Sequence, residues 1–411
     1  MPTYYNNALT TQNILSDEKK IDISTEVAQL APRLSPFMLL ANAPSVAFDG
    51  GQQSGVRNIT FGTRTVTNFE FDWLEDELKS KATAINLVGG YGTTDTVMVV
   101  DDASIFLPGD TILSPASGEV MRLDDRNTTA NTITVTRAFG PVAAAALADD
   151  AVLKITGNVN AENGRSRIYS NTVKTKKTNY IQTIRHTVEV TRMMQLTDTY
   201  TGDPRTYERA KVLREHLEDI EAALMFGKKY KGTEYGGANV EYATGGLLEF
   251  AAGANAISTG VGTLTKATWL SWLKDLFKYG PNEERIIFAS STAATAVSAF
   301  GGNNTSDPKA TVLVANLARE FGMLINTYHT LLGTVHIIVH PLLTGSVYDG
   351  YMVAFDPGMV RMCVPQGGDR FMLYNDLQAL DQQGYKDEYR TDAGLEVRLT
   401  KTMGLMTGIT G

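Results

Sequence analysis

Two long stretches of the chain alternate between polar and apolar residues with a period near two. The first covers residues 56–71 and the second covers residues 178–190. Because successive side chains of a β-strand point to opposite faces, this alternation predicts two long strands, each with one apolar face. The similar character of the two stretches predicts that they pair as one extended β hairpin, with the residues between them forming an insert.

The insert, residues 84–156, contains short apolar runs separated by turn signals. These runs cover residues 96–100, 107–113, 118–123 and 131–137. Short strands at this spacing are typical of small all-β barrels and sandwiches. We therefore expect a separate small all-β domain inside the hairpin.

A long helix is predicted at residues 204–226. Asp203 suits the N-cap, Pro204 suits the first helical position, and Gly227 supplies the stop. Apolar side chains recur at steps of three and four, at Tyr207, Ala210, Leu213, Leu217, Ile220 and Leu224. A helix of this length spans roughly 34 Å, and its single apolar stripe predicts a spine on which a sheet lies.

The rest of the chain divides into an arm, a mixed α/β block and closing strands. Residues 1–23 are polar, and Pro32 and Pro36 interrupt the helical pattern of residues 24–40, so two short turns are expected there. Further helices are predicted at residues 266–279 and 310–321, and strands at 285–289, 335–341, 351–355, 360–364, 388–398 and 403–409. The fold class is therefore α+β.

Composition limits the classes of protein that fit. The 411 residues are 43% hydrophobic and carry a net charge of -8, so two or three domains are expected and binding to nucleic acid by phosphate neutralisation is disfavoured. The single cysteine, Cys363, excludes an intramolecular disulfide and is expected in the core. No secretory signal and no bilayer-spanning stretch is visible, so we expect synthesis in the cytoplasm and no membrane partner.

No motif predicts a catalytic, cofactor-binding or metal-ligating site. Residues 260–266 lack the second glycine of a phosphate loop. His336 and His340 would lie about 13 Å apart on one strand, too far for a shared metal ion. Glu215, Glu218, Asp219 and Glu221 interleave with Arg205, Arg209, Lys211 and Arg214, which predicts a solvated or intersubunit helix face with local ion pairs. We expect no enzyme activity and no cofactor.

The densest positive run, Lys174, Lys176 and Lys177, precedes the second predicted strand. We interpret this run as an electrostatic contact with an acidic neighbouring subunit, with a solvated turn as the alternative. Arg185, Trp73 and Arg64 on the predicted hairpin are further candidates for contacts between subunits.

The order of parts, from polar arm through β hairpin, spine helix and α/β block to closing strands, resembles the major capsid proteins of tailed bacteriophages with the Hong Kong 97 fold. More narrowly, the chain resembles the SU-ten-like major head proteins. The likeness lies in residues 71–78, which end the first strand, in the turns at 107–110 and 118–119, and in the closing segments 394–397 and 403–405.

The resemblance implies a division into named parts. These are an N-terminal arm at 1–55, an E-loop hairpin at 56–83 and 157–195, the inserted β-domain at 84–156, a peripheral (P) domain at 196–235 and 346–411 with the spine helix, and an axial (A) domain at 236–345.

The implied function is that of a bacteriophage major capsid protein, which self-assembles into hexamers and pentamers of an icosahedral head around double-stranded DNA. Implied partners are copies of itself, a scaffolding protein, a portal and a decoration protein, with DNA touched only by weak non-specific contact. The implied location is the virion, after assembly in the host cytoplasm.

Three other readings stay open at this point. An encapsulin-type nanocompartment shell shares the fold, although the insert favours a phage protein. A carbohydrate-binding or adhesive β-protein is suggested by the Thr- and Gly-rich insert, which offers only Tyr91, Phe106 and Phe139 as aromatic residues. An enzyme built on the α/β block is the third.

If the polar arm clamps neighbouring subunits, deletion of residues 1–23 should leave a folded subunit that forms no stable shells, because such an arm gains order only on another surface. Circular dichroism checks the fold and electron microscopy checks the shells. Normal shells from the truncated chain would refute the clamp.

Overall fold

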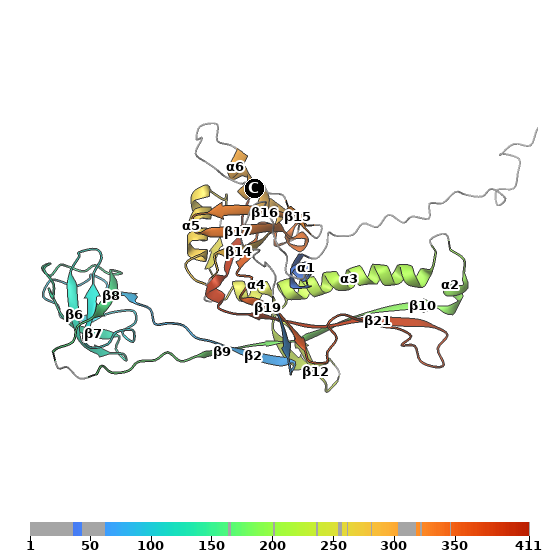
Figure 1. The fold of residues 1–411 in the computed structure, drawn as a ribbon, viewed down its shortest axis with the longest axis horizontal. Coiled ribbons are helices and arrows are strands. Elements are labelled where there is room, and N and C mark those ends of the chain that lie inside the picture. Colours follow the sequence, from blue (N-terminus) through green and yellow to red (C-terminus); the bar gives the residue numbers. More distant parts are fainter. Residues whose placement is uncertain are drawn as a thin grey trace, which may run out of the picture. The chain divides into compact units, whose positions relative to one another are not determined.

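The computed structural model describes residues 36–42, 62–162, 166–199, 202–235, 237–253, 257–260, 262–280, 282–302, 318–320, 323–345 and 347–410. The chain divides into two compact units, one of residues Leu74–Lys176 and one of Met1–Trp73 with Lys177–Gly411 (Figure 1). Most of the predicted arm, residues 1–35 and 43–55, lies outside the described ranges.

The unit Leu74–Lys176 is built on a six-stranded antiparallel sheet. Its strands are β3 (Ala82–Ala84), β4 (Val97–Val99), β5 (Asp110–Leu113), β6 (Val120–Asn127), β7 (Thr132–Thr136) and β8 (Val152–Asn158), in the order β3-β8-β5-β6-β7-β4. A bridge between Ile85 and Val100 links the two ends of that order, so the sheet closes on itself. Closure leaves no long unpaired strand edge.

The core of this unit is mostly apolar, and one of its ion pairs is deeply buried. Alternation places Ile133 and Val135 of β7 inside, as the period of two requires. Arg137 Nε lies 2.7 Å from Glu119 Oε1, and the amides of Ala138 and Ala145 also donate to this carboxylate. Burial opposes ionisation of Glu119, but these donors outweigh it and lower its pKa.

The second unit contains a seven-stranded mixed sheet in the order β13-β22-β18-β14-β17-β16-β15. The strands are β13 (Ile257–Gly260), β14 (Glu284–Ala289), β15 (Ala318–Glu320), β16 (Met323–Thr330), β17 (Gly333–Val339), β18 (Met352–Phe355) and β22 (Gly404–Thr407). Helices α4 (Leu247–Ala251), α5 (Lys266–Leu276) and α6 (Ser291–Gly302) belong to the same unit.

Both faces of this sheet are buried. On β14, Ile286 and Phe288 enter one apolar cluster, whereas Ile287 and Ala289 enter a second cluster that holds Trp269 of α5. A strand buried on both faces reads as a continuous apolar run, which is why residues 285–289 could be predicted.

One sequence prediction for this region needs correction, and another stays a prediction. The domain bounds at 236–345 and 346–411 stay a prediction, and β18 and β22 of the closing segment pair with each other and with β14 and β13 in one sheet. The helix predicted at 310–321 ends in a strand, β15, which pairs with β16. Residues 310–317 lie outside the described ranges.

A long antiparallel ribbon carries the rest of the second unit. It pairs β10 (Gln182–Thr191) with β21 (Gly384–Val397) over ten residue pairs. Neighbouring elements are β19 (Val360–Pro365) and β20 (Met372–Tyr374), which pair with β21, and β1 (Gly62–Val66), which pairs in parallel with β19. Short elements complete it: α2 (Arg192–Leu196), β11 (Tyr230–Thr233), β12 (Val240–Ala243), η2 (Pro341–Leu343) and η3 (Thr400–Thr402).

The single extended hairpin predicted from residues 56–71 and 178–190 is therefore wrong over most of its length. Only β2 (Glu70–Glu75) and β9 (Thr175–Tyr180) pair with each other. The strands β1 and β10 take partners from the closing part of the chain, because their apolar faces are buried there. Val66 packs with Cys363, and Ile184 packs in the large apolar cluster with Leu395.

Helix α3 runs from Pro204 to Phe226 along this ribbon (Figure 1). Asp203 caps its N-terminus and Gly227 ends it, as the sequence predicts. The predicted single apolar stripe is wrong: Ala210 is exposed and Leu217 is only half-buried. The buried side of the helix consists of His216, Ile220, Glu221, Leu224 and Met225.

The short helix α1 (Pro36–Asn42) is fastened to α3 by a buried carboxylate. The amides of Phe37 and Met38 donate to Glu221 at 2.6 and 2.9 Å, and His340 Nε2 lies 2.8 Å from the same carboxylate. Leu342 N–H donates to His340 Nδ1, so the ring donates to Glu221 from Nε2. Glu221 therefore joins three segments that are far apart in sequence, and its assignment to a solvated helix face is wrong.

No helix in the described part of the chain is both long enough and apolar enough to cross a lipid bilayer.

We expect Glu221→Gln to destabilise the fold by about 1–3 kcal/mol, because an amide cannot accept hydrogen bonds as strongly as the carboxylate does. Urea denaturation measures the loss, and hydrogen exchange at the Phe37 and Met38 amides should speed up. Glu215→Gln on the exposed side of α3 is the matched control. Equal stability of the two variants would contradict the fastening role of Glu221.

Candidate functional site

The polar side chains of the second unit gather where α3 meets the ribbon. Among the described residues, no group of three or more histidine, cysteine and acidic side chains is placed to hold a metal ion. The joint between α3 and the β10–β21 ribbon is a structural site.

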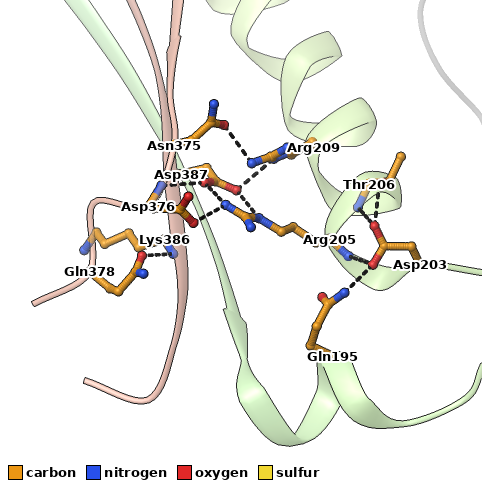
Figure 2. A network of polar contacts seen from close by, with 10 residues as sticks. All are labelled: Gln195, Asp203, Arg205, Thr206, Arg209, Asn375, Asp376, Gln378, Lys386 and Asp387. Atoms are coloured by element: carbon orange, nitrogen blue, oxygen red, sulfur yellow. Dashed lines mark hydrogen bonds and ion pairs between the residues drawn. The ribbon is translucent and has the colours of Figure 1, made fainter. Parts of the chain in front are cut away.

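Asp387 of β21 is the centre of this joint (Figure 2). Arg205 binds it through Nε at 2.8 Å and Nη2 at 2.5 Å, and Arg209 Nε adds a contact at 2.8 Å. The amide of Asp376 also donates to it, at 3.1 Å. The two arginines lie one turn apart on α3, so both guanidinium groups point to the same place on the strand.

Each arginine also holds the loop that precedes β21. Arg205 Nη2 lies 2.7 Å from Asp376 Oδ1, and Arg209 Nη2 donates to Asn375 Oδ1 at 2.7 Å (Figure 2). The guanidinium carbon of Arg205 lies 4.6 Å from the centre of the Tyr385 ring, at the distance of a cation–π contact. The network thus joins a helix end, a strand and a loop.

The charges in this network reinforce each other. Burial opposes ionisation of Asp387, but the hydrogen bonds from Arg205 and Arg209 outweigh it and hold the pKa of this carboxyl well below its usual range. The hydrogen bond to Asp387 raises the pKa of Arg205 in turn. Asp387 and Arg205 are therefore charged at neutral pH.

The N-cap beside the network is also fully bonded. The Asp203 carboxylate accepts from the amides of Arg205 and Thr206 and from Gln195 Nε2, which comes from α2 (Figure 2). The Thr206 hydroxyl and Gln195 contribute most to the lowered pKa of Asp203. This set of bonds fixes the start of α3 and ties α2 to it.

Two histidines meet further along α3. His186 Nδ1 of β10 lies 2.9 Å from His216 Nδ1 of α3. The other nitrogen of His216 lies 2.9 Å from Thr391 Oγ1, and His186 Nε2 lies 3.0 Å from Asp219 Oδ2. The joint is therefore polar from Arg205 to His216, and becomes apolar at Ile220.

A third buried carboxylate, Glu396 of β21, fastens β1. Arg64 of β1 and Arg398 both pair with it, and the Cys363 thiol lies 3.7 Å from Oε2. Cys363 is fully buried, as predicted. Burial, followed by the charge of Glu396, raises the pKa of its thiol to about 12, so it stays protonated.

The residues predicted as contacts between subunits differ in exposure. Lys174 and Arg185 are exposed, and Arg185 lies 3.8 Å from Glu388. Trp73 is 5% exposed and packs against Phe71 and Phe250 of its own subunit. Their contacts with neighbouring subunits stay a prediction.

Sequence reasoning missed the partners of Arg205, Arg209 and Glu221. It assigned these side chains to local ion pairs on α3, whereas the structure pairs the arginines with Asp387 and Glu221 with His340. A weak signal was present, because Asp387 stands at an inward position of an alternating strand, where a carboxylate needs a buried partner.

Comparison with known proteins gives one match that spans the chain. The family model described as SU10 major capsid protein matches residues 3–410. No curated protein matches the chain.

Solved structures resemble the chain more weakly. The capsid of a native GTA particle and a structure of Mycobacterium phage Cain each align at 10% identity and a TM-score of 0.48, over 97% of this chain and 98% of theirs. The SrpI encapsulin of Synechococcus elongatus PCC 7942 aligns at 13% identity and a TM-score of 0.41, over 58% of this chain and 78% of its own. Likeness at this level adds no support to the family match.

Asp387→Asn should lower the free energy of unfolding at pH 7 by about 2–4 kcal/mol, because two arginines lose their shared anion. The free energy of unfolding of this variant should also fall less steeply as the pH is lowered. A carboxyl with a depressed folded pKa stabilises the fold above its unfolded pKa of about 4, and that contribution disappears as the pH falls further.

Urea denaturation at pH 7, 5, 4 and 3 measures both effects. Asp381→Asn, on an exposed loop residue with the same change of charge, is the control. If the loss of stability below pH 4 were as steep in Asp387→Asn as in the unmodified chain, Asp387 would not be its source.

Proposed function

The chain belongs to the SU10 major capsid protein family, and from that premise we propose that it assembles into hexamers and pentamers that form the icosahedral head of a tailed bacteriophage around its double-stranded DNA. The family is a structural one, so the protein is a component of the virion whose work is self-association. The observation that carries the proposal is the match of the family model to residues 3–410.

Exposed apolar side chains support the proposal of self-association. Two stretches of the unit Leu74–Lys176 connect its closed sheet to β2 and β9, and Thr172 Oγ1 bonds Asp76 Oδ1 between them at 2.9 Å. These stretches and the end of β2 carry large apolar residues that face water in the single subunit: Leu74 (64% exposed), Leu78 (98%), Ile168 (72%), Tyr169 (85%) and Val173 (83%). We call these five residues the apolar arm surface.

A narrow pair of strands is at best marginally stable in water unless it packs on another surface. Exposed apolar groups of this size in close succession favour a docking role. In a shell, a neighbouring copy supplies the surface that the apolar arm surface lacks. Lys174, Lys176, Lys177 and Arg185 are our candidates for polar contacts around it.

We propose the following parts of a Hong Kong 97-type subunit. The N-terminal arm is residues 1–55. The E-loop consists of β2, β9 and the two stretches that carry the apolar arm surface. The closed sheet of 84–156 is a domain inserted into the E-loop. The P-domain is α3 with the ribbon and its neighbours, and the A-domain is the seven-stranded sheet with α5 and α6.

Charge limits the partners inside and outside the shell. With a net charge of -8, the subunit would touch packaged DNA only by weak non-specific contact, because tight binding to phosphates requires a clustered positive surface. A scaffolding protein, a portal and a decoration protein are the further partners that we propose, with assembly in the host cytoplasm.

Electron microscopy tests the proposal directly. The purified protein, alone and co-expressed with its neighbouring open reading frames, should form closed shells or capsomer rings. DNA inside particles from infected cells would separate a phage head from an enzyme-filled nanocompartment. A protein that stays monomeric under all of these conditions would overturn the proposed function.

The role of the apolar arm surface has its own test. The triple variant Leu78→Ser, Tyr169→Ser and Val173→Ser should keep the thermal melting of the subunit and fail to form shells, since it removes only exposed apolar groups. Val347→Ser, at a residue that is 92% exposed in the other unit, is the control. Normal shells from the triple variant would exclude the arm surface as a required contact.

A further inference from the structure

The interface between α3 and the ribbon changes character along the helix. From Arg205 to His216 the contacts are hydrogen bonds and ion pairs to β10 and β21. From Ile220 onward, Leu224 and Met225 pack in the large apolar cluster. The two halves therefore respond to different conditions, because protons act on the polar half and leave apolar packing unchanged.

The His186–His216 contact accommodates a limited number of protons. A carboxylate only accepts hydrogen bonds, so His186 Nε2, at 3.0 Å from Asp219, carries a proton. The two Nδ1 atoms are 2.9 Å apart, which requires that one donates and the other accepts. In the uncharged pair His186 Nδ1 is therefore the acceptor and His216 Nδ1–H is the donor, and only one proton fits between the rings.

We propose that this histidine pair is an acid-releasable joint: when both rings are protonated, the N-terminal half of α3 separates from the ribbon while the C-terminal half stays packed. A second proton would place two N–H groups against each other and two positive charges within contact distance. The pair can relieve this only by moving apart. Because one ring is on α3 and the other is on β10, moving apart opens the interface.

The groups that face the pair offset the second charge only in part. Tyr389 and Thr391 of β21 and Phe371 surround His216, and none of these is a carboxylate. Asp219 of α3 is the acidic neighbour, and it contacts His186 from a side chain that is 61% exposed. Asp387, further along the same face of β21, is held by Arg205 and Arg209.

The titration of His216 agrees with this geometry. Burial, followed by the charge of His186, lowers the pKa of His216 to about 4, and Asp219 opposes this only in part. A histidine whose folded pKa lies below its unfolded value of about 6.5 contributes full stability above pH 6.5 and loses it as the pH falls towards 4. The window lies above the range in which Asp387 titrates.

Another buried histidine, His340 at the start of η2, contacts α3 and leaves its C-terminal half intact. His340 already donates to Glu221 from Nε2. A further proton on its Nδ1 would displace only the hydrogen bond from the Leu342 amide, and would add charge attraction to Glu221. The anchor of α1 and of the C-terminal half of α3 therefore persists in mild acid.

Hydrogen exchange on the full chain, as unassembled subunits at pH 7.5 and pH 5, tests the proposal. With protection factors corrected for the intrinsic rate at each pH, amides at 208–216 should lose protection about 30-fold, the ratio expected for a histidine pKa that moves from about 6.5 in the open form to about 4 in the closed form. Amides at 220–226 should keep theirs.

Variants identify the source of the change. His216→Gln keeps a hydrogen-bonding side chain without a titrating ring, so residues 208–216 should stay protected at pH 5. His329→Gln, at an exposed histidine in another sheet, should behave as the unmodified chain. The proposal would be refuted if amides 208–216 of the unmodified chain were equally protected at pH 7.5 and pH 5. It would also be refuted if His216→Gln lost as much protection at pH 5 as the unmodified chain.

If His216→Gln does not fold, His186→Gln tests the proposed joint in its place. Its amide oxygen can accept from a protonated His216, so the facing N–H groups disappear and acid should no longer open the interface. Opening of this variant at pH 5 to the same extent as the unmodified chain would refute the proposal.

Discussion

A buried carboxylate must be paired, and three such groups determine how distant parts of this subunit are held together. Glu221, Asp387 and Glu396 are at most 1% exposed. Leaving any of them without donors would cost several kcal/mol, so each site requires its partners to be in place. Glu221 accepts hydrogen bonds from α1 and His340. Asp387 pairs with two arginines of α3 and bonds the loop before β21. Glu396 pairs with Arg64 of β1.

These three fastenings lie around the same framework, the ribbon of β10 and β21 with α3 upon it. The apolar clusters supply most of the burial, on both faces of the seven-stranded sheet and under the C-terminal half of α3. Apolar packing alone is tolerant of position, whereas a bidentate arginine–carboxylate pair has a fixed geometry. The carboxylates therefore set the register of helix and strands that the apolar contacts then stabilise.

The distribution of exposed apolar side chains complements this rigid framework. Within the unit Leu74–Lys176 the closed sheet buries its own core, yet the stretches that lead to it carry Leu78, Tyr169 and Val173 into water. In the shell that we propose, a neighbouring copy would cover these side chains.

The sequence by itself determined the features that depend on neighbouring residues. Asp203, Pro204 and Gly227 mark both ends of α3, and the apolar run at 285–289 marks a strand buried on both faces. Only the tertiary structure decided which strands pair: β10 takes β21 and β1 takes β19, and the closing strands β18 and β22 enter the sheet of the α/β block. Caps and periodicity act over a few residues, whereas these strand pairings, the His340 partner of Glu221 and the arginine partners of Asp387 join residues more than fifty positions apart. Alternation is also the same whichever strand lies opposite.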